Sequence, residues 1–214
     1  LRKGREQARR VICLSHLKQI AHGTSMYLTD HNEMVPLGPS DMLNVQQTQS
    51  GRVVTNLTTC HWGGRRAGWL HGPDPEKEKR PLTAYLYRDA SLDMQTPVFR
   101  CPSDRPTEWS DSLMPGSPIY EVCGNSYYLN MFGEIERQHR LSSTSTSRVI
   151  VYLEAPLHEL FAKASQGMGW HGQFSTHNVV FLDMHAEGLY IDSRQRKAPD
   201  WNVSDFIAMN GFLE

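Results

Sequence analysis

The chain has 214 residues, of which 39% are hydrophobic, and its acidic and basic residues nearly balance to a formal charge of -1. A chain of this size can bury one core, and without a basic surplus it does not fit a general nucleic-acid binder, so we expect no nucleic-acid partner. Mean hydropathy is -0.51, and the sequence lacks the run of about 20 apolar residues that a membrane span needs.

The first thirty residues predict one long amphipathic helix, because no proline interrupts them and apolar residues recur at helical spacing. The predicted packing stripe consists of Val11, Leu14, Leu17, Ile20, Ala21 and Leu28, with Cys13 and Tyr27 at its flanks. The first ten residues are basic and lack a continuous apolar face. Asp30, His31 and Asn32 are expected to end the helix, and Pro36 opposes its continuation.

The middle of the chain, about residues 37–95, is expected to be a loop-rich insertion that contains a strand at 51–57 and a short helix at 82–87. Residues 97–102 are expected to form a short strand. The stretch from there to Pro118 is rich in proline, serine and aspartate, which is typical of a surface loop.

The C-terminal half is rich in strand formers. Strands are expected at 126–130, 148–153, 178–183 and 187–191, the last two as a hairpin, and a short helix at 204–209 closes the chain. The expected fold class is α+β, with the long N-terminal helix packed on an antiparallel β-sheet. Residues 1–36 are then the helix and its exit loop, and residues 37–214 the globular α+β head.

The four cysteines are Cys13, Cys60, Cys101 and Cys123, and none forms the CxxC pair of a zinc ribbon. An even number of cysteines is compatible with disulfides in an oxidising compartment, and Cys101–Cys123 is the first pairing to consider. Free, buried thiols are the alternative.

A cluster of histidines and acids in the C-terminal half is the candidate metal site, with a divalent metal as its cofactor. Its proposed ligands are Asp183, His185, His171 and Glu154. Asp183 and His185 share one face of a strand, about 6–7 Å apart, whereas His177 is roughly 20 Å from Asp183 along a straight strand. Hydrogen-bonded structural histidines are the alternative.

A second candidate for metal binding is calcium in the loop that ends the first helix, where Asp30, Asn32 and Glu33 offer oxygen ligands. The spacing does not match an EF-hand, and helix termination explains the same residues.

Signatures of catalysis are missing, since there is no GxSxG, P-loop, HExxH or GxGxxG motif, and we expect no enzyme. Two alternatives to a structural protein stay open. The first is a metal-assisted hydrolase that uses the C-terminal His/Asp cluster. The second is a carbohydrate-binding module, in which tryptophans in loops stack on sugar. The five tryptophans are Trp62, Trp69, Trp109, Trp170 and Trp201.

Four landmarks occur in one order along the chain. They are the helix text from Arg5 to Ile20, the segment Phe99-Arg100-Cys101-Pro102-Ser103-Asp104, the segment Ser126-Tyr127-Tyr128-Leu129-Asn130, and the strand pair that opens at His177. Together they resemble the prepilin-like (pseudopilin-type) proteins abundant in planctomycete and related bacteria, which carry a type IV pilin N-terminus and a C-terminal Asp-Gly-His motif.

The resemblance implies a structural subunit of a pilin-like or type II secretion pseudopilus-like assembly. In such proteins a leader and a hydrophobic helix precede the basic segment, so it implies an inner-membrane anchor that has been removed here, with a periplasmic or cell-surface head. Its expected partners are other pilin-like subunits or copies of itself, and the inner membrane. The basic residues then lie near lipid phosphates or acidic neighbours, although a solvated helix face is the alternative.

One position departs from the family pattern, because Asp183-Met184-His185 stands where the family has Asp-Gly-His. Loss of the glycine argues against a left-handed backbone there, and the turn is expected to shift towards Gly188.

Overall fold

The fold is built from one long helix, one four-stranded sheet and several short helices. The computed structural model describes residues 2–32, 36, 45–48, 51–54, 62–65, 80–89, 91, 94–130 and 146–203. In chain order the elements are α1 (Arg2–Asp30), β1 (Val45–Thr48), β2 (Gly51–Val54), α2 (Thr83–Leu86), the 3-10 helix η3 (Pro97–Phe99), α3 (Glu108–Leu113), α4 (Ile119–Cys123), β3 (Tyr127–Leu129), β4 (Ile150–Glu154), α5 (Ala155–Ala162), β5 (Thr176–Phe181) and β6 (Ala186–Tyr190).

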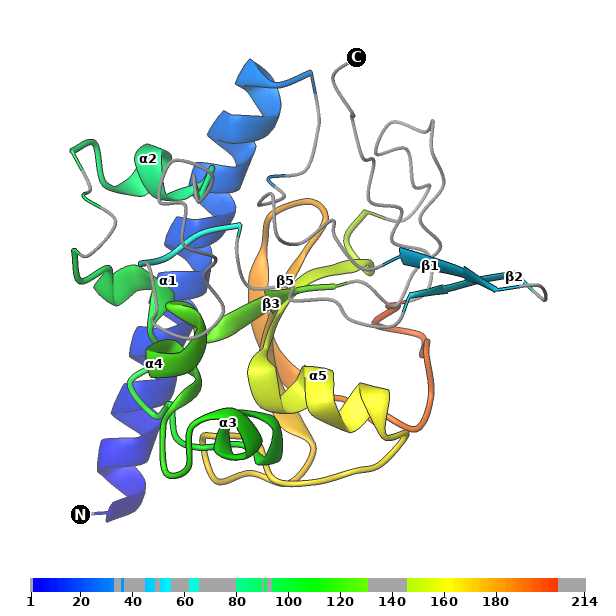
Figure 1. The fold of residues 1–214 in the computed structure, drawn as a ribbon. Coiled ribbons are helices and arrows are strands. Elements are labelled where there is room, and N and C mark those ends of the chain that lie inside the picture. The colour runs from blue at the N-terminus through cyan, green and yellow to red at the C-terminus, as the bar shows by residue number, and fades with distance from the viewer. Residues whose placement is uncertain are drawn as a thin grey trace.

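The main sheet has the order β3-β4-β5-β6, and every neighbouring pair is antiparallel. The helix α1 runs along the sheet and packs mainly on β5 and β6, whereas α5 lies against β4 and β3 (Figure 1). Neighbouring residues of β5 point to opposite faces of the sheet. Val180 belongs to the hydrophobic cluster that includes the buried residues of α1, and Val179 belongs to the cluster that includes those of α5. The sheet is therefore covered on both faces, and the predicted α+β class with a helix on an antiparallel sheet is confirmed.

The buried face of α1 is rotated from the predicted stripe. Leu17 and Ile20 are fully buried and Leu14 and Leu28 are half-buried, but Val11 is 58% exposed. Cys13 takes the place that the prediction gave to Val11. Two residues along a helix correspond to a turn of about 200°, so Val11 and Cys13 cannot share a face.

The segment between residues 97 and 123 contains helices where a strand and a loop were predicted. Pro97–Phe99 is a 3-10 helix, and its proline supplies the fixed backbone angle that suits a helix start. The predicted surface loop holds α3, whose start is closed by a capping box between Thr107 and Ser110. Short helices of this kind lack the long apolar periodicity that sequence patterns detect.

The β5–β6 hairpin keeps the turn that the missing glycine was expected to move. Met184 has a φ of 68° and so occupies the left-handed conformation itself. Gly188 lies inside β6, paired with Asn178, and a Cβ there would lie 2.4 Å from a guanidinium nitrogen of Arg10. The expected shift towards Gly188 was therefore wrong, because Met184 adopts the left-handed conformation at the turn and Gly188 is paired within β6.

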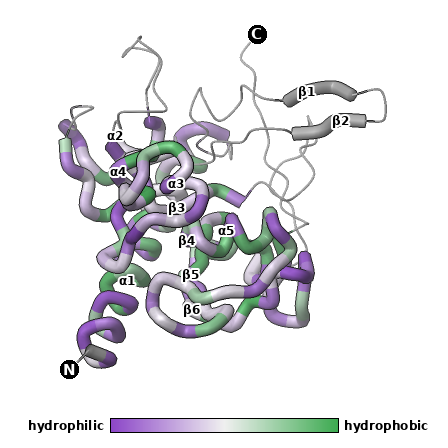
Figure 2. The backbone as a smooth tube through the Cα atoms, turned by 60° about the horizontal axis from the view of Figure 1, so that its bottom comes forward, coloured by the Kyte–Doolittle hydropathy of each residue, from purple (hydrophilic) through white to green (hydrophobic). Residues whose placement is uncertain are grey.

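The first turns of α1 are mostly hydrophilic (Figure 2). Within the described residues, no helix has an apolar stretch long enough to cross a bilayer. The predicted helix at 204–209 and the end of the predicted strand at 55–57 lie outside the described residues.

A buried cluster of cysteine, histidine and glutamate as the candidate functional site

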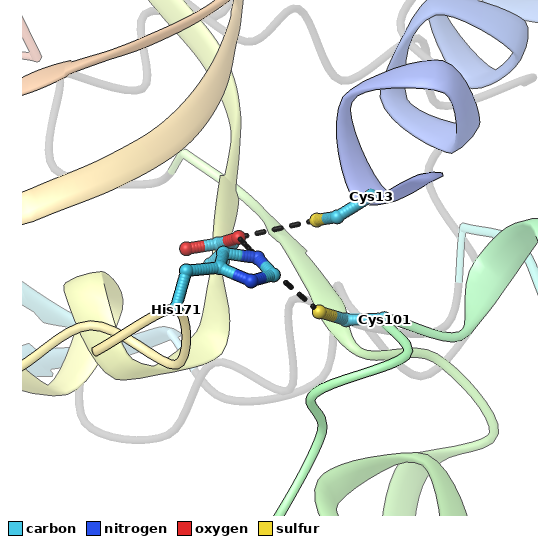
Figure 3. A group of neighbouring side chains, drawn as sticks. Cys13, Cys101 and His171 are labelled. Carbon is cyan, nitrogen blue, oxygen red and sulfur yellow. Dashed lines mark hydrogen bonds and ion pairs between the residues drawn. The ribbon is translucent and has the colours of Figure 1, made fainter. Parts of the chain in front are cut away.

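Four metal-ligating side chains from four segments meet in the interior beside α1. They are Cys13, Cys101, Glu154 and His171, hereafter the CCEH cluster; one ligand atom from each lies within 4.8 Å of all the others, and all four residues are buried. Figure 3 shows the side chains of Cys13, Cys101 and His171 pointing towards one another from separate parts of the chain.

Three members of the CCEH cluster are positioned by the secondary structure that carries or adjoins them. Cys13 lies on the buried face of α1, and Cys101 follows η3, where its N–H donates to the Ser126 hydroxyl at 3.1 Å. Glu154 is both the last residue of β4 and the residue that begins α5, with Pro156 in the first turn of that helix. Two of the four segments are thus regular elements of the sheet and its covering helix.

The Glu154 carboxylate is the centre of the hydrogen bonding. It has no exposed surface, and Oε1 accepts from the Cys13 thiol at 3.2 Å and lies 3.0 Å from His171 Nε2. Asn178 donates to the same carboxylate through its backbone N–H and its side-chain amide, at 3.3 and 3.0 Å. A buried carboxylate needs this many donors, because burial without partners costs several kcal/mol.

His171 bridges two carboxylates and contacts the second thiol. Its Nδ1 lies 3.1 Å from Glu6 on the first turns of α1, and its Nε2 lies 3.6 Å from Cys101 Sγ as well as close to Glu154. Ser103 donates a short hydrogen bond to Glu6. The N-terminal part of α1 is thereby connected to the cluster through a second residue besides Cys13.

The pKa values of the cluster depart from their ordinary values. Burial alone lowers the pKa of His171, but its hydrogen bonds to Cys13 and Glu154 and their negative charges outweigh burial and raise it to about 10. Burial alone raises the pKa of Glu154, but the hydrogen bond and charge of His171 hold it below the usual value. Burial raises the pKa of the Cys101 thiol well above normal. The cluster therefore holds charge in the interior.

His177 lies beside the cluster without a hydrogen bond. Its side chain is fully buried, neither ring nitrogen has a hydrogen-bond partner among the described residues, and Nδ1 is 4.0 Å from Glu154 Oε2. Burial lowers the pKa of His177 to about 4, against the raising effect of Glu154. Buried polar groups are normally satisfied, so an unsatisfied ring here marks this part of the interior as unusual.

The segment that supplies Cys101 also supplies a helix cap. Both oxygens of Asp104 accept backbone N–H groups at the start of α4, from Ile119 at 3.1 Å and from Tyr120 at 2.7 Å. Ser126 donates to the same carboxylate at 2.7 Å. The residue that begins α4, Pro118, makes no side-chain cap, so Asp104 does this from a distant segment.

All four landmarks of the sequence therefore converge on one place. The helix text supplies Cys13 and Glu6, the second landmark supplies Cys101 and Ser103, the third supplies Tyr127, whose hydroxyl is 3.3 Å from Cys13 Sγ, and the fourth supplies His177 and Asn178. Sequence order alone could not show this meeting, because the four segments are distant along the chain.

The structure divides the predicted set of metal ligands. His171 and Glu154 are brought together, but Asp183 and His185 form a separate exposed pair, with His185 Nδ1 2.5 Å from Asp183 Oδ1. That pair follows the end of β5 where Phe181 faces Ile150, at the opposite end of β4 from Glu154. The four residues do not form one site. The hydrolase alternative required them to lie together, so its proposed set of metal ligands is not assembled. The sequence analysis did not predict Cys13 and Cys101 as metal ligands.

The predicted Cys101–Cys123 disulfide is not formed. Cys13, Cys101 and Cys123 are all free and buried, and Cys60 lies outside the described residues. Cys101 points into the CCEH cluster, whereas Cys123 ends α4 and contacts the Tyr128 hydroxyl at 3.8 Å. The free, buried thiols that stood as the alternative describe these three cysteines.

The other candidate sites gain no support from the described residues. Trp62, Trp170 and Trp201 are buried and so offer no stacking platform, and Trp69 lies outside the described residues. Trp109 is half-buried and packs edge-on against Tyr128. Of the calcium candidates, Asp30 accepts a hydrogen bond from Tyr85 at 3.0 Å, and Glu33 lies outside the described residues.

The fold and the buried cluster define an α+β protein in which a long helix is fastened to an antiparallel sheet. A family model described as "Protein of unknown function (DUF1559)" matches residues 2–195, so the chain belongs to that family. The family is found in bacterial pilin-like and secreted proteins. Neither the curated proteins nor the solved structures gave a match.

Proposed function

We propose that this chain is the extracytoplasmic head of a membrane-anchored, pilin-like structural subunit, and that α1 is the C-terminal part of a longer helix. The observation that carries the proposal is the form of α1. It is one unbroken helix of 29 residues that packs on β5, β6, α2 and η3, while its N-terminal end projects from the head (Figure 1). Membership of a family found in pilin-like proteins supports the same function.

The exposed surface of α1 fits contact with neighbouring subunits and with a membrane. Val11 is 58% and Ile12 45% exposed, which places two large apolar side chains in solvent on the outer side of the helix. Lys3 and Arg5 are exposed near the N-terminal end and suit anionic lipid headgroups. Arg10 is not part of this surface, because it donates to Gln173 at 2.9 Å and to the Gly188 carbonyl at 3.1 Å.

We infer that the partners are other pilin-like subunits or copies of this chain, and that the head lies in the periplasm or at the cell surface. A type II secretion pseudopilus is the assembly that the sequence resemblance favours.

Membrane partition of the native, full-length gene product tests the anchor. We expect it in the detergent phase, with a hydrophobic segment before Leu1 and a processed N-terminus in the intact mass. If the native protein partitions into the aqueous phase and its intact mass corresponds to a chain that starts near Leu1, the proposal fails.

Photo-crosslinking in the native host tests the partners. A photoreactive amino acid at Val11 or Ile12 is expected to capture another pilin-like subunit. The matched control is Arg194, which is exposed on the loop after β6 and should give no such adduct. Equal capture at both places would contradict an interface on α1.

A further inference from the structure

We propose that the CCEH cluster is a structural zinc site, with Cys13 and Cys101 as thiolate ligands, His171 Nε2 as the nitrogen ligand and Glu154 as the carboxylate ligand. The inference stands independently of the proposed function.

The spacing of the ligand atoms is close to that around a tetrahedral ion, since all four lie within 4.8 Å of one another. Zn–S bonds of about 2.3 Å and Zn–N or Zn–O bonds of about 2.0–2.1 Å separate neighbouring ligand atoms by about 3.3–3.8 Å. The observed separations are 3.2 Å for Cys13 Sγ to Glu154 Oε1, 3.0 Å for His171 Nε2 to Glu154 Oε1, and 3.6 Å for Cys101 Sγ to His171 Nε2. An ion can therefore enter with small side-chain movements.

The donor set selects the metal. Two thiolates with an imidazole favour zinc, whereas calcium and magnesium require oxygen ligands. Two thiolates and one carboxylate carry three negative charges in the interior, and a divalent cation offsets two of them. Without a cation the Cys13 thiol keeps the proton that it donates to Glu154, so metal binding releases protons from the thiols.

The surroundings of His171 match those of a metal-bound histidine. Such a histidine usually donates its other ring N–H to a carboxylate, which fixes the ring and its tautomer. Here Nδ1 faces Glu6 at 3.1 Å, and Ser103 holds Glu6 in turn. Asn178 orients the Glu154 carboxylate in the same way through two hydrogen bonds.

The burial of the ligands indicates a structural and not a catalytic ion. Cys13 and Glu154 have no exposed surface, Cys101 is 1% and His171 7% exposed, so no ligand position opens to solvent. Catalytic zinc keeps an open position for water or substrate. The ion would join α1, the segment after η3, the β4–α5 junction and the loop before β5, and thereby fasten α1 to the head.

Zinc content of the 214-residue chain tests the site directly. The protein is produced in zinc-supplemented medium, purified without a metal-binding tag or chelator, and measured by elemental mass spectrometry. We expect about one zinc ion per chain. Cobalt substitution should give a thiolate-to-cobalt charge-transfer band, which reports ligation by sulfur.

Matched variants locate the site. Cys101→Ser and His171→Gln should lose the zinc, Glu6→Gln should weaken zinc affinity by about 10–100-fold, and Cys123→Ser should keep it, because that thiol is buried outside the cluster. Circular dichroism confirms that each variant is folded.

Several results would overturn the proposal, and they do not depend on whether a variant folds. They are a zinc-free wild-type protein, a cobalt form without a thiolate band, and a wild-type mass under non-reducing conditions that shows a Cys13–Cys101 disulfide. Among folded variants, equal loss of zinc in Cys123→Ser and Cys101→Ser would also overturn it.

Discussion

Two histidine–acid pairs in this protein have nearly the same chemistry and opposite surroundings. In the CCEH cluster, His171 and Glu154 are 3.0 Å apart with side chains 2% and 0% exposed. At the β5–β6 turn, His185 and Asp183 are 2.5 Å apart with side chains 41% and 35% exposed. An exposed pair contributes about 0–1 kcal/mol, whereas removal of one member of a buried pair costs about 3–5 kcal/mol. Burial and convergence, and not residue type, decide which pair is a site.

The largest expected effect comes from the centre of the buried pair. Glu154→Gln should lower the free energy of unfolding by about 3 kcal/mol or more, because it removes the charge that His171 requires and keeps the side-chain volume. Asp183→Asn at the exposed turn should change it by less than about 1 kcal/mol. Urea denaturation with chelator and reductant measures both variants without metal. Equal losses would break the comparison between the two pairs.

A smaller loss is expected at Asp104, a half-buried acid without a histidine among its hydrogen-bond partners. Asp104→Asn should cost about 2 kcal/mol, because an amide nitrogen replaces one of the two oxygens that accept the N–H groups of Ile119 and Tyr120 at the start of α4. The control is Asp111→Asn, where an exposed carboxylate accepts a single N–H from Gly116. If Asp104→Asn is as stable as its control, Asp104 does not hold α4 in place.

The half-buried His158 should give the opposite sign of pH dependence from His171, whose pKa is raised. Burial, and then the charge of Arg196, lower the pKa of His158 to about 4 from an unfolded value of 6.5. The unfolded chain therefore binds the extra proton, so stability is fully present above pH 6.5 and is lost as the pH falls towards 4. The maximum slope is about 1.4 kcal/mol per pH unit.

His158→Gln should reduce the loss of stability between pH 7 and pH 4 without abolishing it, because the pKa of His177 is also lowered to about 4. Urea denaturation across this pH range measures the slope. His185→Gln is the exposed control and should leave that slope unchanged. A wild-type slope in His158→Gln would show that His158 titrates normally.

The smallest expected effect concerns the exposed turn itself. Met184 is non-glycine at a φ of 68°, which costs about 1 kcal/mol. Met184→Gly removes that strain and loses some packing, so we expect a change below about 1 kcal/mol. Met184→Ile should be clearly less stable than Met184→Gly, because a β-branched residue tolerates this conformation poorly. Thermal unfolding of the two variants compares them, and equal melting temperatures would argue against a left-handed turn.

The helix and the strands could be predicted because their signals are local. The strand around Ile150 and the hairpin near Val180 are predicted by short runs of β-branched residues. The helix α1 is predicted by apolar residues that recur at helical spacing without interruption. Which face of α1 is buried was harder to predict. Cys13 was placed at the flank of the stripe and Val11 within it, although the sheet buries Cys13 and leaves Val11 in solvent.

The candidate site could be predicted only in part. His171 and Glu154 were named as metal ligands, but their predicted partners came from the same C-terminal half, where strand spacing gave a reason to place Asp183 and His185 together. The actual partners, Cys13 and Cys101, reach the site through tertiary packing of α1 and of the segment after η3. One signal was available, since both cysteines lie within the landmarks of the family resemblance.

The central claim is that a metal ion joins α1 to the head at the CCEH cluster. The most direct measurement is a crystal structure of the zinc-supplemented protein with anomalous data on both sides of the zinc absorption edge. We predict one strong anomalous peak within bonding distance of Cys13 Sγ, Cys101 Sγ, His171 Nε2 and Glu154. No peak at that position, or a bond between the two sulfur atoms in its place, would contradict the account.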